Sequence, residues 1–223
     1  MLWNAGASGG VSRLALAPAA FDETRAVARA WFRELGRERF TWWVADSATP
    51  GDLCDRLTAL GAEPEVELAA MVRDEPPPVA DGVTARPIES LEEHLAFREL
   101  VWEAFDVPED IRAAGRAQRE QAWRDYVAMD HQVIFVALLD DTIAAGASVI
   151  LKPTGGFLLG GNTRPELRGR GAYRALVRAR WDEAERRGTP LLGVHAGPMS
   201  RPILERLGFR TVSHVHVFAD RAS

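Results

Sequence analysis

The chain has 223 residues, of which 47% are hydrophobic and 26% are charged, and its formal net charge is −5. This composition is typical of a soluble globular protein of one large domain or somewhat more. The acidic balance argues against general binding to nucleic acids. The single cysteine, Cys54, excludes an intramolecular disulfide, and no apolar run approaches the ~18 residues of a membrane span. Met1 to Gly10 has neither a basic region nor an apolar run, so we expect no signal peptide and a cytoplasmic protein.

The first part of the chain predicts alternating strands and amphipathic helices. Residues 1–10 are expected to be weakly held. Strands are predicted at 11–17, 40–44 and 66–72, and helices at 21–35 and 50–60, each followed by a glycine. Residues 73–82 (RDEPPPVADG) are polar and rich in proline, which is typical of a linker between two parts of a chain.

The second part predicts a different order of elements: an extended segment, two helices, a meander of three strands, a long helix, a strand, a short helix and a last strand. The extended segment covers 83–88, the helices 91–105 and 108–129, the meander 133–139, 142–151 and 157–163, and the later elements 173–184, 191–196, 200–207 and 211–218.

The segment between the meander and the long helix, Pro165 to Leu176, contains Gly169 and Gly171, each flanked by arginine. Glycines allow a sharp turn and close approach to a ligand, and the free N–H groups of a helix start favour an anion. A P-loop is excluded because the only lysine is Lys152. A dinucleotide fingerprint would need a third glycine where Arg174 stands. An ordinary glycine turn into a helix stays open.

The run Arg168-Gly-Arg-Gly-Ala-Tyr173 resembles the coenzyme A pyrophosphate loop of the GNAT N-acetyltransferase superfamily, although the family has glycine or alanine where Tyr173 stands. Ser200 to Phe209, which ends in Leu-Gly-Phe, is similar to the family's late helix, and the element order over 82–220 agrees. The resemblance implies an α/β (α+β) fold, the GNAT acyl-CoA N-acyltransferase fold, with a mixed sheet and a splayed central strand pair, in a domain at 82–223.

Residues 1–75 echo the C-terminal half of that domain at an offset of 150 residues. We interpret them as a degenerate GNAT-like half-domain without a glycine loop, and therefore without a coenzyme site. A chance likeness between two amphipathic helices stays open. The aligned pairs are Val27/Val177, Trp31/Trp181, Val44/Val194, Leu53/Ile203 and Leu57/Leu207.

The resemblance implies direct transfer of an acyl group from acetyl-CoA, or another acyl-CoA, to a small amine. The strands on either side of the long helix would splay apart and hold the pantetheine arm between them. The cofactor-binding residues that it implies are Asn162 and Thr163 at the thioester end and Arg168, Gly169, Arg170, Gly171, Ala172 and Tyr173 in the loop.

The catalytic groups are less well matched. The family's glutamate base is absent from 157–163, and Glu166 lies in a turn where we expect it to be solvated. His195, at a strand end, is the substitute base, with a hydrogen-bonded structural histidine as the alternative. The family's tyrosine acid corresponds to Leu204, and Ser200 is expected either to hydrogen-bond the departing thiolate or to cap its helix. These gaps keep open a catalytically degenerate acyl-CoA-binding or interaction module.

We expect no metal, because His214 and His216 share a strand face without a third ligand nearby. The acceptor pocket is expected near the first two helices of the second part, where residues 105–110 supply acids and where Trp102 and Trp123 either line the pocket or pack in the core. The expected partner is a small-molecule amine, with no nucleic acid and no membrane, and a homodimer is left open.

Overall fold

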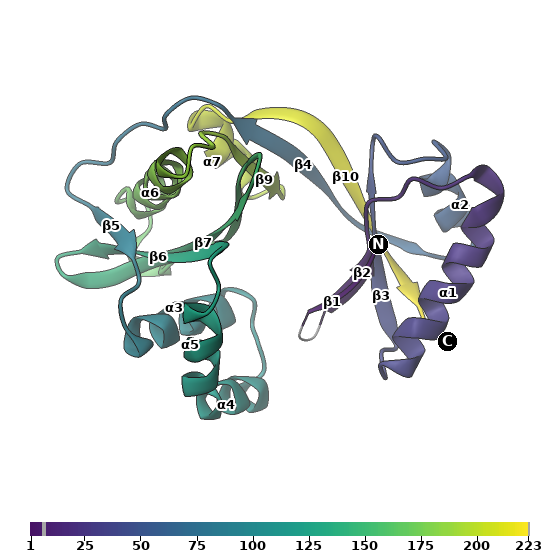
Figure 1. Cartoon of the computed structure of the whole chain (residues 1–223), viewed down its shortest axis with the longest axis horizontal. Coiled ribbons are helices and arrows are strands. Elements are labelled where there is room, and N and C mark those ends of the chain that lie inside the picture. Colours follow the sequence, from purple (N-terminus) through teal and green to yellow (C-terminus); the bar gives the residue numbers. More distant parts are fainter. Residues whose placement is uncertain (6–7, 223) are drawn as a thin grey trace. The chain divides into compact units, whose positions relative to one another are not determined.

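The computed structural model describes residues 1–5 and 8–222 (Figure 1). The chain forms two compact units. The first unit contains Met1–Met71, His195–Glu205 and Arg210–Ser223, and the second contains Val72–Val194 and Arg206–Phe209.

The first unit is a sheet with helices on one face (Figure 1). Its strands lie in the order β1 (Leu2–Ala5), β2 (Ser8–Val11), β3 (Arg39–Ala45), β10 (Arg210–Arg221) and β4 (Glu63–Arg73). The helices are η1 (Pro18–Ala20), α1 (Phe21–Glu34) and α2 (Leu53–Ala59). β2 runs parallel to β3, and β10 pairs with β3 in the antiparallel sense.

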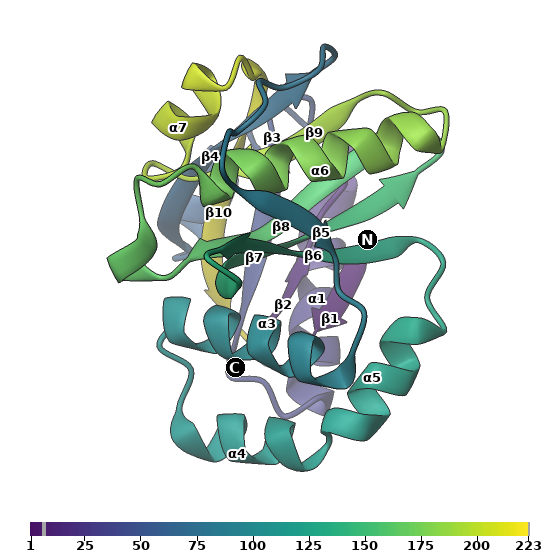
Figure 2. The ribbon, with the colours of Figure 1, turned by 90° about the vertical axis from the view of Figure 1, so that its left-hand side faces the viewer.

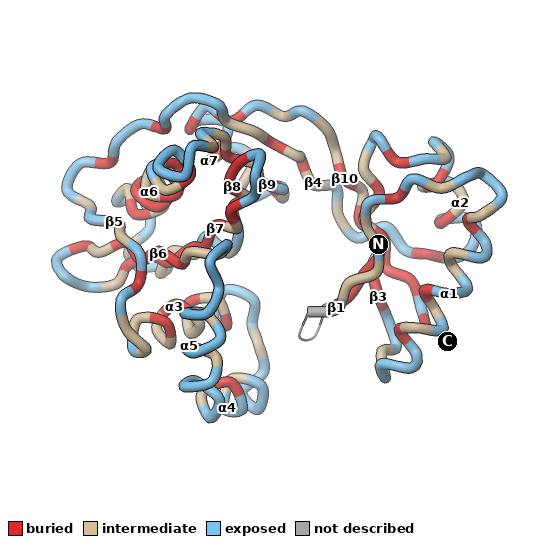
Figure 3. The backbone as a smooth tube through the Cα atoms, in the orientation of Figure 1, coloured by how far each residue is buried: buried red, intermediate tan, exposed pale blue. Residues whose placement is uncertain are grey.

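Residues of β3 alternate between the two faces of this sheet, as the two-residue period of a strand requires. Phe40, Trp42 and Val44 are buried, whereas Thr41 and Trp43 are only half-buried (Figure 3). The buried set packs with the apolar stripes of α1 and α2 into one core. The other main members of that core are Phe21, Phe32, Leu53 and Leu57.

A buried ion pair crosses this core. The carboxylate of Asp220 accepts hydrogen bonds from Arg25 Nε at 2.8 Å and Nη2 at 2.9 Å, and from Trp42 Nε1 at 3.1 Å. The side chain of Asp220 is only 3% exposed and that of Arg25 14%. The pair links α1 to β10, so the last strand of the chain is part of the fold of the first unit.

The second unit has strands in the order β9 (Leu192–Ala196), β8 (Gly155–Thr163), β7 (Thr142–Lys152), β6 (Gln132–Leu139) and β5 (Thr84–Pro87). Helix α6 (Ala172–Arg186) covers one face of these strands, and α3 (Leu91–Ala104) with α5 (Arg119–Val127) covers the other (Figure 2). Helix α4 (Glu109–Ala117) contacts α3 and α5. The sheet is mixed because β8 and β9 are parallel and the β5–β8 pairs are antiparallel, which confirms the predicted fold class.

The parallel pairing of β8 with β9 is short. It joins Gly156 to Leu192 and Phe157 to Gly193, whereas β8 continues to Thr163. The register of β8 with β7 also shifts between Gly146 and Ser148, where two residues of β8 face one of β7. Among the residues that the structure describes, the β9-facing edge of β8 therefore has no partner in this register beyond Phe157, as a splayed strand pair requires.

The structure corrects three predicted elements. The single helix at 108–129 is wrong: it divides into α4 and α5 at Gln118. The strand at 11–17 is wrong beyond Val11, since Ala15 forms only an isolated bridge with Thr49. Residues 1–10 are not weakly held where they are described, because β1 and β2 form a hairpin; residues 6 and 7 lie outside the described residues.

The division into domains 1–75 and 82–223 stays a prediction, and so does the internal duplication. The series β2–α1–β3–α2–β4 has the same order as β8–α6–β9–α7–β10, where α7 is Arg201–Arg206, and both series begin with a parallel strand pair around a helix. The aligned residues, however, differ in burial. Val27 is 54% exposed where Val177 is buried, and Leu53 is buried where Ile203 is 40% exposed. The likeness is therefore one of architecture more than of individual side chains.

Candidate active site

The predicted anion cradle is a loop that ends at the N-terminus of α6. Gly169 and Gly171 both have left-handed backbones, with φ of 77° and 90°. Gly171 is the residue before the helix. No side chain in the described part of the chain caps α6, and the first turn of the helix contains no acid. The first N–H groups of α6 are therefore offered to a ligand, and the helix dipole favours an anion there.

The two arginines of the loop are exposed, and each has a partner. Arg168 Nε donates to the carbonyl of Thr163 at 3.4 Å. Arg170 Nη2 lies 3.1 Å from Asp140 Oδ2, in the β6–β7 turn. Asp140 reaches this position because both residues of that turn, Asp140 and Asp141, have positive φ. Part of the charge that Arg170 brings to the loop is thus balanced by Asp140.

Asn162 and Thr163 end β8 on the segment that lies beyond the β9 register. Their backbones pair with Gly146 and Ala145 of β7. The Asn162 side chain donates to the carbonyl of Gly160 at 3.0 Å. These contacts hold the end of β8 from the β7 side, and its opposite edge lies beyond the register with β9.

Tyr173, which departs from the family pattern, lies over a glycine of the neighbouring strand. A Cβ on Gly161 would come within 2.5 Å of Tyr173 Cε2, so the ring occupies the space of a missing side chain. Arg180 lies next to this ring, with its guanidinium carbon 5.9 Å from the ring centroid. We find that Tyr173 is accommodated by this packing and leaves the backbone of the loop in place.

Arg180 was not predicted from the sequence. It is 1% exposed, and it donates to the carbonyls of Leu176 at 2.9 Å and Ser148 at 3.3 Å. Its Nη2 has no hydrogen-bond partner among the described residues. Burial lowers the pKa of this guanidinium, while Tyr173 acts in the opposite direction. The i, i+7 spacing from Tyr173 was the available signal, because it places both side chains on one helix face.

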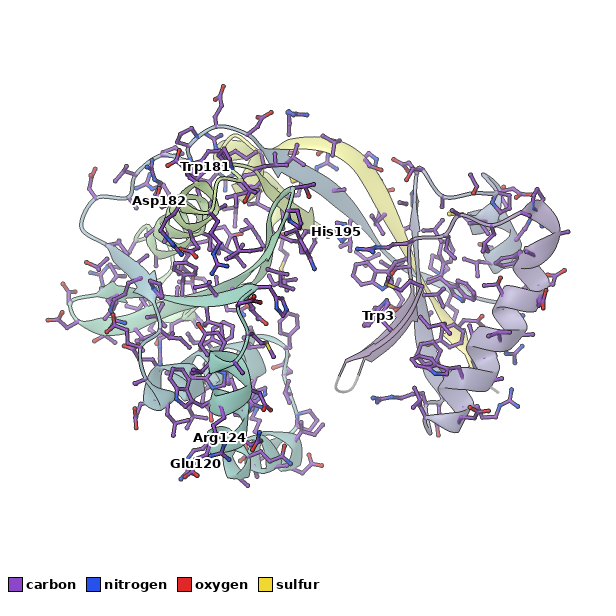
Figure 4. All side chains as sticks on the ribbon, viewed as in Figure 1. Trp3, Glu120, Arg124, Trp181, Asp182 and His195 are labelled. Atoms are coloured by element: carbon purple, nitrogen blue, oxygen red, sulfur yellow. The ribbon has the colours of Figure 1, made fainter. Side chains whose placement is uncertain are left out.

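His195 and Ser200 belong to the first unit, whereas the loop belongs to the second. His195 lies at the end of β9, is exposed, and has its ring centroid 5.8 Å from that of Trp43 (Figure 4). The surrounding protein removes part of the hydration of the imidazole, which lowers its pKa below the ordinary value. An imidazole with a lowered pKa is uncharged at neutral pH and can accept a proton.

Ser200 precedes α7, and its hydroxyl donates to the carbonyl of Gly197 at 3.3 Å. That bond belongs to the turn that starts the helix. Leu204, at the family's tyrosine position, is fully buried and has no polar group. No hydroxyl replaces that tyrosine at its own position. The glycine of Leu-Gly-Phe, Gly208, has φ of 82°, and a Cβ there would collide with the guanidinium of Arg73.

Of the residues expected to line an acceptor pocket, the two tryptophans are packed within the second unit, whereas Asp106, Glu109 and Asp110 are exposed. The ring of Trp102 lies close to two guanidiniums, with its centroid 4.7 Å from Cζ of Arg98 and 5.7 Å from Cζ of Arg116. Trp123 packs against His94 at 5.8 Å. Glu109 forms an ion pair with Arg116 at 2.6 Å. For both tryptophans, the structure therefore supports packing between helices over lining a pocket.

His214 and His216 both reach Asp46, at 3.4 Å each, and His216 also lies 3.6 Å from Glu67. Within residues 1–5 and 8–222, no group of three or more histidine, cysteine or acidic side chains has a geometry that could hold a metal ion. No helix in the same range is long and apolar enough to cross a membrane.

The acetyltransferase (GNAT) family model matches residues 94–209, which is more than half of the chain. The chain therefore belongs to the GNAT acetyltransferase family, an acyl-CoA-dependent class of acyltransferases. No match was found among curated protein sequences.

Solved structures with the same fold cover nearly the whole chain. A GCN5-related N-acetyltransferase from Kribbella flavida has a TM-score of 0.70 and 16% identity, with 96% of this chain and 80% of that chain covered. A tandem GNAT protein from the clavulanic acid biosynthesis pathway has a TM-score of 0.67 and 17% identity, with 97% and 75% covered. A GCN5-related N-acetyltransferase from Sphaerobacter thermophilus has a TM-score of 0.63 and 18% identity, with 92% and 70% covered. At these identities the likeness concerns the fold.

Proposed function

We propose that this protein transfers an acetyl group from acetyl-CoA to a small amine by direct attack of the amine on the thioester. The observation that carries the proposal is the uncapped start of α6, preceded by two left-handed glycines and adjacent to the unpaired edge of β8. The helix start suits a pyrophosphate, and the strand edge suits the amide groups of a pantetheine arm.

In this proposal the amine nitrogen attacks the thioester carbon, the bond from that carbon to sulfur breaks, and the amine loses a proton. His195 is the proposed acceptor of that proton, directly or through water, because its imidazole is uncharged at neutral pH. The thiolate takes up a proton from water or from Ser200, whose hydroxyl would first have to leave the carbonyl of Gly197.

Binding is tested first, by thermal unfolding and calorimetric titration with acetyl-CoA. A ligand at a hundredfold excess over its Kd should stabilise the protein by about 2.7 kcal/mol. No binding at millimolar concentration would overturn the proposal.

Turnover separates the proposal from a non-catalytic acyl-CoA-binding module, which buried Leu204 and the acid-free β8 keep as the second candidate. Release of free thiol is measured across a library of primary and secondary amines. Release that depends on the amine supports the transferase, whereas tight binding without release supports the module.

A further inference from the structure

The first unit carries two tryptophans on the sheet face that α1 and α2 leave uncovered. Trp43 belongs to the half-buried set of β3, opposite to the buried Trp42. Trp3, on β1, projects from the same face (Figure 4), and its ring centroid lies 6.2 Å from that of Trp43 at an interplanar angle of 73°. His195 continues the row, 5.8 Å from Trp43. We call Trp3, Trp43 and His195 the aromatic row; all three belong to the first unit.

The orientation of the row is fixed by its neighbours. Trp43 Nε1 donates to Thr41 Oγ1 at 3.0 Å, and Thr41 Oγ1 donates to the carbonyl of Gly9 at 3.2 Å. The only polar atom of the Trp43 ring, Nε1, thus already has a hydrogen-bond partner, so the ring can contact a ligand through its apolar face. A Cβ on Gly10 would lie 3.0 Å from Trp3 Cζ2, so the glycine lets that ring lie close to the strand.

The other five tryptophans are engaged elsewhere. Trp42 and Trp181 are almost fully buried, and Trp31 packs against Phe32 at 4.7 Å on the helix side. Trp102 and Trp123 are packed in helix contacts of the second unit. The aromatic row therefore accounts for the two tryptophans that the cores of the described units do not use.

We propose that the aromatic row binds the acceptor amine as its ammonium ion; this rests on the proposed function. The electron-rich faces of indole rings attract an ammonium group. The net charge of −5 also favours the approach of a cation over that of an anion. The bound ammonium ion gives up one proton before it attacks the thioester and a second one after the attack; His195 beside it can accept one of the two, and water takes up the other.

The row is tested directly by fluorine NMR on protein labelled with 5-fluorotryptophan, with the signals of Trp3 and Trp43 assigned from Trp3→Phe and Trp43→Phe. The probes are tyramine, its neutral counterpart tyrosol, in which a hydroxyl replaces the amine, and tetramethylammonium, a cation without a ring. Tyramine and tetramethylammonium should shift both signals saturably and leave those of Trp31 and Trp42 in place. Tyrosol should bind about two- to thirtyfold more weakly than tyramine, the range of a cation–π contact.

Equal responses to tyramine and tyrosol would overturn the proposal, because the row would then be a neutral apolar surface. Failure of both cations to shift the two signals would overturn it as well. These readouts do not need turnover, so they remain decisive even if no amine is acetylated. In that case the proposed function is wrong, and the fluorine signals alone decide whether the aromatic row binds ammonium ions.

Kinetics supply the second arm. Trp43→Leu should raise the KM for the amine about tenfold and change kcat and the KM for acetyl-CoA little, whereas Trp43→Phe should restore most of the affinity. Trp31→Leu is the matched control on the helix side and should leave the KM for the amine unchanged. A rise in KM that is equal in Trp43→Leu and Trp31→Leu would mean that both act through stability, and would count against the row.

Discussion

Gly171 allows the sharpest test of the cradle, because a side chain there has space but an unfavourable backbone. The nearest atoms to an added Cβ are Val83 Cγ2 at 3.6 Å and Arg174 Nη2 at 3.7 Å, which are ordinary contacts. With φ of 90°, however, any non-glycine residue adds strain of about 1–2 kcal/mol. Gly171→Glu should therefore fold, with a stability lowered by about that amount.

The effect of Gly171→Glu on ligand binding should be much larger than its effect on stability. A carboxylate about 5 Å from a phosphate charge, at an effective dielectric constant of about 20, opposes it by about 3 kcal/mol, or more than a hundredfold in affinity. The same carboxylate could also pair with Arg174 and withdraw that cation from the ligand. Gly171→Gln, with the same backbone strain and bulk but no charge, should lose far less affinity.

Calorimetric titration of coenzyme A into wild type, Gly171→Glu, Gly171→Gln and Gly169→Glu decides the matter. Gly169 shares the left-handed backbone, with φ of 77°, but an added Cβ there meets no atom within 4 Å. Gly169→Glu therefore brings the same charge and a similar backbone strain to a more open position of the loop, while Gly171→Gln controls for strain without charge. If Gly171→Glu binds like wild type, the loop is not the site. If it binds like Gly171→Gln, the electrostatic part of the reasoning is wrong.

Three further predictions concern His195, His94 and the buried ion pair. His195→Ala should lower kcat/KM by about 10²–10⁴-fold and leave coenzyme binding unchanged. It should also abolish the part of the pH–rate profile in which kcat/KM rises with pH below about 6.5. A loss of stability without a loss of rate would mean that His195 is a structural residue. His94 is 6% exposed, and its pKa is lowered by burial first and then by Arg98. The contribution of His94 to the free energy of unfolding should therefore be full above about pH 6.5 and be lost as the pH falls. In urea unfolding, His94→Phe should lose that pH dependence. Asp220→Ala should lower the free energy of unfolding by about 3–5 kcal/mol, because it leaves the charge of Arg25 buried and unpaired. The double variant Arg25→Met with Asp220→Asn should recover most of that loss, and no recovery would contradict this account.

Element type and order in the second unit were predictable because the apolar pattern was strong. Buried strands such as β6 and β7 appear as continuous apolar runs, and α6 has a clear helical stripe. The break at Gln118 was not predictable in this way. Residues on both sides of it favour helix, and the contacts of α4 with α3 are long-range information that a local pattern does not contain. The β1–β2 hairpin was missed for the opposite reason, since its glycine-rich sequence is a weak strand signal.

The candidate site was predictable where it depends on the backbone. Glycines with flanking arginines predicted a sharp turn into a helix, and in the structure Gly169 and Gly171 have positive φ directly before the start of α6. The aromatic row was not predictable. Trp3, Trp43 and His195 are far apart in the sequence, and they meet only because β1, β2 and β3 are neighbours and because β9 ends in the first unit. No local spacing contains that information.

The two departures from the family pattern differ in kind. Tyr173 replaces a small residue in a loop whose proposed ligand contacts are backbone N–H groups, and the ring is accommodated over Gly161 beside Arg180. The departure can therefore leave the cradle working. Leu204 replaces a tyrosine whose contribution to the family's chemistry is its side-chain hydroxyl, and no backbone group can supply that hydroxyl's proton. Coenzyme binding is thus expected to be retained while acid catalysis is reduced. A reaction on this site would depend mainly on holding the amine and the thioester together, an effect that can itself provide much of a rate enhancement.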